Sequence, residues 1–234
     1  MSDRPFLPRR LATSLRWPAG VVLTAWAYMW RTTPMHRRER PGDWEEDRPP
    51  PLPDELEDDE LQRVADGAGP LLRRRYRARI SEGELPAAAL IERLKADPNR
   101  VAPGALAHFE KRVGENGRMA LGDEWVVRMP GPWDGPVRVI DLTPTSFRFG
   151  TLSGHLEAGQ IEWRADDEDG DVLFAIESWA RSGDRLSHVM HNRLRMAKEV
   201  QLHIWTSVIE QVAELAGGRL VRGIDIDTRR VEID

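Results

Sequence analysis

A long amphipathic helix predicted near the C-terminus constrains the fold more than any other feature of the sequence. From Ser182 or Asp184, either of which would cap the helix, apolar residues recur every three or four positions as far as Leu215, and Gly217-Gly218 ends the pattern. About thirty residues make a helix roughly 45 Å long. A helix with one apolar side of that length needs a large apolar surface to cover, which predicts a sheet beneath it. The stripe consists of Leu186, Met190, Leu194, Ala197, Ile204, Val208, Val212 and Leu215.

The segments before this helix supply that sheet. Apolar and polar residues alternate with a period of two, which predicts strands, and short turns such as the acidic stretch 166–170 join them, so neighbours in sequence should pair antiparallel. Two short helices are expected between the first strand and the others, at 86–96 and 103–113. The predicted strands are 71–80, 123–129, 137–142, 145–152, 160–165 and 172–181. Together these elements predict an α+β domain.

Charge divides the chain into parts. Residues 1–42 hold eight arginines and two acidic residues, whereas 43–61 hold ten acidic residues and one arginine among several prolines. We therefore expect a basic, Trp-rich helical arm (1–42), an extended acidic linker or wrapping segment (43–66), the main domain (67–218), and a tail (219–234) that either adds an edge strand or is loose. Arginines on one side of strand 71–80 are expected to be covered by this acidic segment or solvated beside it.

The arm contains the one uncharged stretch that invites a membrane interpretation. Residues 17–30 are uncharged, but as a helix they span only ~21 Å against the ~30 Å of a hydrocarbon core. Trp17, Trp26, Trp30 and Tyr28 between arginines suit an interfacial helix, while packing on the protein's own domain is the plainer alternative. We expect a cytoplasmic protein, with peripheral membrane contact through residues 17–30 as the alternative.

Several functional classes are disfavoured by what the sequence lacks. It has no cysteine, no phosphate-binding or dinucleotide-binding glycine motif, no nucleophile elbow and no H-E-x-x-H. The formal charge of −5 argues against a general nucleic-acid binder. His188 and His191 are spaced like metal ligands on the long helix, but His203 points about 120° away from His191. We therefore predict no cofactor, no metal site and no nucleic-acid partner.

The order of elements resembles the helix-grip domain of the START-like superfamily, which includes birch-pollen-allergen-like proteins and polyketide cyclases. The stretches 122–133 (GDEWVVRMPGPW), 146–152 (SFRFGTL), 154–159 (GHLEAG) and 178–181 (SWAR) are similar to motifs of one family within it, domain of unknown function nineteen-ninety. The resemblance covers about residues 69–217 and leaves 1–66 outside. It implies a curved sheet wrapped around the last helix with a cavity between them, and it transfers no catalytic residue.

Six residues are candidates for a ligand site. His155 and Glu157 lie in a glycine-bracketed turn, where His155 either holds the turn through backbone hydrogen bonds or takes part in binding or acid–base chemistry with Glu157. Glu177 is predicted to form an ion pair at the cavity mouth or to anchor a ligand's polar group. Trp125, Trp163 and Trp179 would provide apolar area. The sequence predicts binding of a hydrophobic or amphipathic small molecule; the alternatives are an enzyme on the same scaffold and a membrane- or partner-anchored interaction protein.

Overall fold

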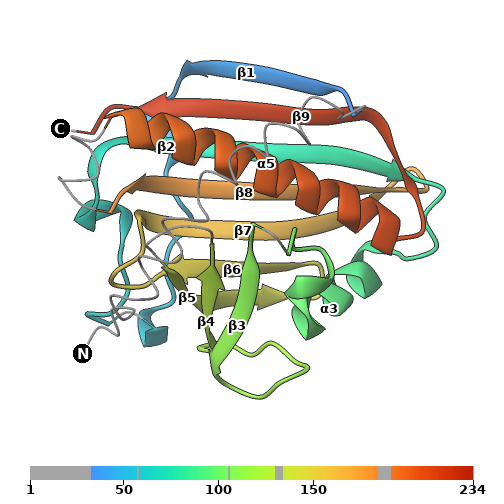
Figure 1. Ribbon diagram of the computed structural model, residues 1–234, viewed down its shortest axis with the longest axis horizontal. Coiled ribbons are helices and arrows are strands. Elements are labelled where there is room, and N and C mark those ends of the chain that lie inside the picture. Colours follow the sequence, from blue (N-terminus) through green and yellow to red (C-terminus); the bar gives the residue numbers. More distant parts are fainter. Residues whose placement is uncertain (1–32, 57, 105, 130–133, 184–190, 234) are drawn as a thin grey trace.

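The structure, a computed structural model, describes residues 33–56, 58–104, 106–129, 134–183 and 191–233 (Figure 1). Within them one long, curved sheet carries a helix across one of its faces, which is the helix-grip arrangement expected from the sequence. The sheet order is β1-β9-β2-β8-β7-β6-β5-β4-β3. The strands are β1 (Met35–Pro41), β2 (Ala68–Ser81), β3 (His108–Val113), β4 (Glu124–Arg128), β5 (Asp134–Thr143), β6 (Ser146–Thr151), β7 (Glu157–Glu168), β8 (Asp171–Ser182) and β9 (Arg219–Val231).

Strands β4 to β8 form the predicted antiparallel meander, β3 extends it beside β4, and β2 pairs antiparallel with β8. The turn between β7 and β8 needs only Asp169 and Gly170, which have φ of 54° and 84°. Two residues of positive φ are typical of the tight hairpin turn that matches the twist of antiparallel strands. The acidic stretch therefore ends in a turn as predicted, but β7 continues into it as far as Glu168.

Helix α5 (His191–Leu215) lies across the sheet, and α3 (Ala87–Ala96) with the short η3 (Pro98–Arg100) covers the same face beside it (Figure 1). We call this the inner face and the opposite one the outer face. Gly217, with φ of 71°, follows the end of α5, and the Gly218 amide donates to the Ala213 carbonyl. That pattern is a common glycine C-cap, so the helix ends where the sequence predicted.

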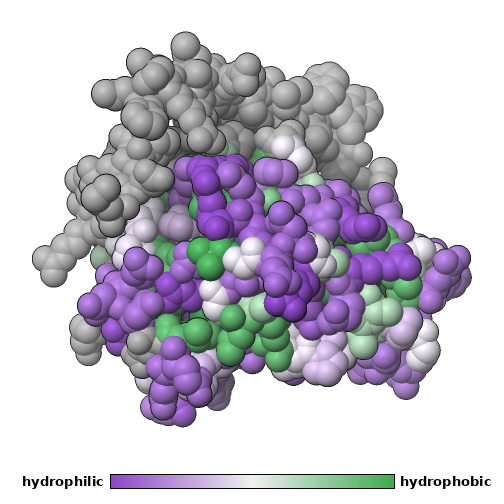
Figure 2. Space-filling model, turned by 90° about the horizontal axis from the view of Figure 1, so that it is seen from below, coloured by the Kyte–Doolittle hydropathy of each residue, from purple (hydrophilic) through white to green (hydrophobic). Residues whose placement is uncertain are grey.

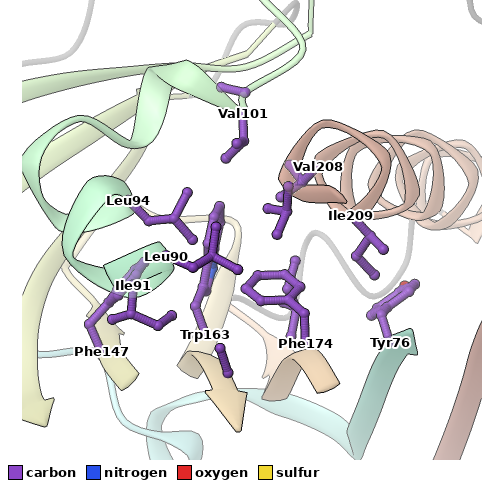
Figure 3. Close-up of a cluster of buried hydrophobic side chains, with 14 of the residues drawn as sticks. Tyr76, Leu90, Ile91, Leu94, Val101, Phe147, Trp163, Phe174, Val208 and Ile209 are labelled. Carbon is purple, nitrogen blue, oxygen red and sulfur yellow. The ribbon is translucent and has the colours of Figure 1, made fainter. Parts of the chain in front are cut away.

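The core fills the space between sheet and helices. Leu90, Ile91 and Leu94 of α3 meet Val208 and Ile209 of α5 over the aromatic side chains of the sheet (Figure 3). Trp163 lies at the centre, 1% exposed, with its ring centroid 5.3 Å from that of Phe147 and 6.4 Å from that of Phe174. Close-packed aromatic rings of this kind leave little free volume in this half of the interior.

One predicted element was wrong: residues 108–113 form strand β3 and not part of a helix. Phe109 is buried in the core and pairs with Val127 of β4, while Asn99 bonds both the amide and the carbonyl of Phe109. Pairing with β4 gives the backbone N–H and C=O groups of this segment hydrogen-bond partners in the sheet. Such tertiary pairing overrides a local preference for helix.

Both ends of the sheet-forming chain also differ from expectation. Residues 35–41, placed by the sequence in a helical arm, form the edge strand β1, which runs parallel to β9. Residues 219–231 form β9, which is neither an edge strand nor loose, because it pairs with β1 on one side and β2 on the other. The expected tail is thus an interior strand of the domain. The Trp-rich stretch 17–30 lies outside the described residues.

The acidic segment wraps the outer face, as the charge pattern indicated. It contains α2 (Trp44–Asp47), η1 (Asp54–Leu56) and η2 (Val64–Asp66). Asp47 accepts from Arg73, Asp58 accepts from Arg138, and Leu61 packs with Ile140 and Leu152. The segment therefore neutralises arginines of the sheet and buries apolar side chains of its own.

One side of the molecule has a mainly polar surface. Seen from below, hydrophilic side chains dominate, with hydrophobic ones in separate patches (Figure 2). The large hydrophobic residues that are exposed are Trp44, Val113 and Leu121. None of the described helices combines the length and the apolar character that a membrane span requires.

We predict that Asp47→Asn lowers the free energy of unfolding by about 2 kcal/mol, because Asp47 is fully buried and accepts from both Arg73 and the Asp43 amide. Burial by itself raises the pKa of Asp47, but the bonds from Arg73 and Asp43 and the nearby Arg229 lower it on balance below 3.8. The stabilisation is therefore present above about pH 4 and lost as the pH falls through the lowered value.

Chemical denaturation at neutral and acid pH measures this effect. Glu45→Gln is the matched control, because the Glu45 carboxylate is exposed and should change stability by less than about 0.5 kcal/mol. Equal stabilities of the Asp47 variant and the natural protein at neutral pH would contradict the role of Asp47.

Candidate functional site

A row of polar side chains crosses the otherwise apolar inner face beneath α5. Arg74 of β2 and Ser178 of β8 are paired in register, and they are 7% and 5% exposed. Arg74 Nη1 donates to Gln201 Oε1 on α5 at 2.5 Å, and Gln201 Nε2 donates to Glu157 Oε2 on β7 at 3.0 Å. Arg74 Nη1 also lies 3.6 Å from Glu157 Oε1. Arg74, Ser178, Glu157 and Gln201, which we call the polar row, come from three strands and the helix, and Gln201 bonds two of them.

Strand alternation explains why these side chains point inward. Inner positions of β2 are Leu72, Arg74, Tyr76, Ala78 and Ile80, so Arg74 is the single charged residue among them. Neither Arg74 nor Ser178 was among the predicted site residues. The signal that could have found Arg74 is a charge on the apolar side of an amphipathic strand, which is costly unless it is paired or functional.

The polar row lies at one border of the aromatic core around Trp163. On the side away from that core, the next inner positions of β2, β8 and β7 are Leu72, Ala180 and Gly159 in register, so two of the three side chains are small or absent. Glu157 lies one inner position further along β7, opposite Ser182, so the contact from Arg74 to Glu157 spans this layer. The first ten residues of α5 extend roughly 15 Å past Gln201 on this side (Figure 1).

Several buried polar atoms next to the row have no hydrogen-bond partner among the described residues. They include Ser178 Oγ and, one helical turn after Gln201, Trp205 Nε1, whose ring packs edge-on against Trp163 with centroids 5.9 Å apart. The Trp125 Nε1 atom is also buried and unpartnered. Buried polar atoms are nearly always hydrogen-bonded, so these atoms mark places where another molecule is expected.

The structure separates the predicted His155–Glu157 pair. The Glu157 amide donates to His155 Nδ1 at 2.9 Å, while the Glu157 carboxylate turns to Gln201 and Arg74. Nδ1 also lies 3.0 Å from the Glu157 carbonyl oxygen, so it accepts from the amide or donates to the carbonyl according to which ring nitrogen carries the proton. His155 therefore holds the turn before β7 through backbone contacts, and the two side chains do not form a hydrogen-bonded acid–base pair.

The three predicted tryptophans are divided between the two faces. Trp163 and Trp125 lie on the inner face in the core, and Lys111 Nζ lies 4.8 Å from the Trp125 ring centroid. Trp179 lies on the outer face with Val64, Leu71 and Val231.

Glu177 also lies on the outer face. Its carboxylate binds Arg73 at 2.5 Å and Arg75 at 3.0 Å. It therefore forms the ion pair that sequence analysis considered, although on the side of the sheet away from α5. Neither Glu177 nor Trp179 joins the polar row.

A separate pocket of about 220 Å³ lies on the outer face between the acidic segment and β7. Gln160 Nε2 donates to the Pro50 carbonyl there, and Gln160 Oε1 is buried without a partner among the described residues. In the whole described part of the chain, no group of three or more His, Asp or Glu side chains is arranged to hold a metal ion. The pocket is lined by Pro49, Pro50, Pro51, Leu52, Leu61, Gln62, Arg63, Val64, Ala65, Gly159 and Gln160.

A curved, mainly antiparallel sheet with a long helix across its inner face defines this chain as a helix-grip protein. Its sequence matches the model of the family described as Domain of unknown function (DUF1990) over residues 45–210, and the chain belongs to that family. The match begins within the acidic segment, which sequence analysis had placed outside the resemblance. No curated protein matches the chain.

Solved structures share the general arrangement at low identity. Major latex-like protein 151 from Panax ginseng is 13% identical, with 62% of this chain and 97% of that chain covered and a TM-score of 0.43. Norcoclaurine synthase from Thalictrum flavum, in complex with dopamine and hydroxybenzaldehyde, is 9% identical, with 65% and 88% covered and a TM-score of 0.43. A hypothetical protein from Helicobacter pylori is 6% identical, with 61% and 86% covered and a TM-score of 0.46.

We predict that His155 makes the fold less stable as the pH falls. Burial lowers the pKa of His155 below its ordinary 6.5, against the opposing effects of the Glu157 carboxylate and backbone. The unfolded chain then takes up a proton near pH 6.5 that the folded chain accepts only at lower pH, so protonation favours unfolding.

Melting temperatures of the natural protein and His155→Asn between pH 7.5 and about pH 5 measure the effect. Asparagine retains an oxygen that can accept from the Glu157 amide but does not titrate. The natural protein should lose more stability on acidification than the variant, and the other histidines cancel in the comparison. Parallel curves would contradict the prediction.

Proposed function

We propose that this protein binds an amphipathic small molecule between the sheet and α5, with its polar group at the polar row. The observation that carries the proposal is the polar row itself, in which buried donors next to an apolar core lack partners among the described residues. Ser178 Oγ and Trp205 Nε1 supply donors from opposite walls, the sheet and the helix. Ligand sites are typically apolar with a few such convergent polar groups.

The packing supports one position for the apolar part of the proposed ligand. Around Trp163 the aromatic rings occupy the interior, so the ligand cannot lie there without displacing them. The layer of Ala180 and Gly159, which the contact from Arg74 to Glu157 spans, has the shorter side chains and lies toward the first part of α5. We therefore place the ligand's apolar part along Leu72, Ala180 and Gly159.

Of the predicted site residues, Glu157 belongs to the proposed site directly. Trp163 supports it by packing against Trp205. The acid–base alternative loses its motivation, because His155 Nδ1 contacts backbone groups of Glu157 and the Glu157 carboxylate contacts Gln201 and Arg74. Binding without a reaction is the simplest function that these contacts support.

Ala180→Leu should weaken ligand binding at least about tenfold. The added carbon atoms occupy the space assigned to the ligand's apolar part, and filling such space costs about 1–3 kcal/mol. The measurement is a titration of the full chain with N-phenyl-naphthylamine, a neutral fluorophore that brightens in apolar sites. Ala175→Leu is the matched control, because Ala175 lies on the outer face of the same strand β8.

Melting curves of both variants without the probe show whether each is folded. Saturable binding that weakens in the Ala180 variant and persists in the Ala175 variant supports the proposal. Binding that is equal in both folded variants places the probe elsewhere, for example in the outer pocket, and contradicts the proposal. If the Ala180 variant does not fold, Ala180→Val provides the same test with a smaller side chain.

A further inference from the structure

The Arg74 guanidinium uses only one of its three nitrogens within the described part of the chain. Both of its contacts, to Gln201 Oε1 and to Glu157 Oε1, are made by Nη1. The remaining nitrogens, Nε and Nη2, form the edge of the guanidinium that binds two oxygens side by side. Arg74 as a whole is 7% exposed, but Nε and Nη2 are not among the buried side-chain atoms that lack a partner, so this edge keeps access for a solvent-sized molecule.

The contacts of Nη1 fix the direction of that edge. Gln201 bonds both Arg74 and Glu157, so its amide holds the guanidinium and the carboxylate in one arrangement. An arginine that is already immobilised loses less conformational freedom when it binds a ligand. The unused edge is thus presented in advance and does not have to be ordered by the ligand.

Ser178, beside Arg74, offers a further hydrogen-bond donor to a group bound at this edge. Ser178 is the register partner of Arg74 on the inner face, and its hydroxyl is buried without a partner among the described residues. A planar group with two acceptor oxygens can accept from Nε and Nη2 together, and one of the oxygens has a further lone pair for a hydroxyl donor. The chemical group with that shape and charge is a carboxylate.

We propose that the ligand is an amphipathic carboxylic acid whose carboxylate binds the Nε–Nη2 edge of Arg74, with Ser178 as an additional donor. This inference rests on the proposed function and adds the chemical class of the ligand. Glu157 sets the affinity from the opposite side, because its negative charge lies next to Nη1 and offsets part of the attraction of Arg74 for an anion. Removal of that charge should therefore tighten binding of the acid.

The experiment compares decanoic acid with decanamide at neutral pH and at concentrations below aggregation. Each competes with N-phenyl-naphthylamine on the full chain, and the measured quantity is the ratio of the two affinities. The natural protein should prefer the acid at least about tenfold, which corresponds to one charge-assisted bidentate contact. Decanamide has the same chain length and nearly the same shape but no charge.

Three substitutions test the assignment. Arg74→Lys keeps the charge but not the two-nitrogen edge, so the preference for the acid should fall to less than threefold, whereas Glu157→Gln should raise it. Arg75→Lys is the control, because Arg75 lies on the outer face with Glu177 and should leave the preference unchanged. Loss of packing alone would weaken the binding of both ligands to a similar extent. It would not lower the ratio of affinities in Arg74→Lys and raise it in Glu157→Gln.

The outcomes separate this inference from the proposed function. If neither the probe nor any of the ligands binds, the proposed function is wrong. If acid and amide bind the natural protein equally, or if the Arg74 variant keeps the full preference, binding exists but the carboxylate assignment is overturned. A weaker preference for the acid in the Glu157 variant would likewise contradict the assignment. Should Arg74→Lys fail to fold, the ratio in the Glu157 variant and a Ser178→Ala variant decides the question.

Discussion

The pairing of β2 along both of its edges is the constraint on which the rest of the structure depends. β8 pairs with one edge and β9 with the other, so β2 cannot rotate or slip without breaking both ladders. A slip of one residue would exchange its two faces and bury Arg73 and Arg75 under α5. The fixed register instead directs these arginines outward and Tyr76, Ala78 and Ile80 into the core. It also directs Arg74 inward, where apolar residues would otherwise be continuous.

The arginines on the two faces of β2 differ in how many of their nitrogens are bonded within the protein, and this difference bears on function. On the outer face Arg73 contacts both Asp47 and Glu177, and Arg75 binds Glu177 through two nitrogens, so the acidic segment and β8 satisfy them. On the inner face Arg74 makes its contacts through a single nitrogen. The outer arginines thus use their donors within the protein, whereas the Nε–Nη2 edge of Arg74 stays available to a ligand.

Local pattern was sufficient to predict most of the fold. Alternation in 71–80 and 172–181 and the stripe of the last helix were strong enough to predict the strands, their antiparallel order and the covering helix. Residues 108–113 were misjudged because their strand state depends on pairing with β4, a partner that local propensity does not contain. The same holds for β9, whose place between β1 and β2 is set by contacts with segments more than a hundred residues away.

The site was harder to predict because its members come from four separate elements. His155 and Glu157 are two positions apart in sequence, which suggested a pair, but the register of β7 directs Glu157 inward while His155 remains in the turn. Glu177 and Trp179 share a face, as expected, yet which face is settled only by the position of α5. Arg74, Ser178 and Gln201 carry no motif and meet only after β2, β8 and α5 are assembled. A charged residue on the apolar side of a strand was therefore the one local sign of the site, and it deserves more weight than the histidine-containing turn when chains of this fold are interpreted from sequence.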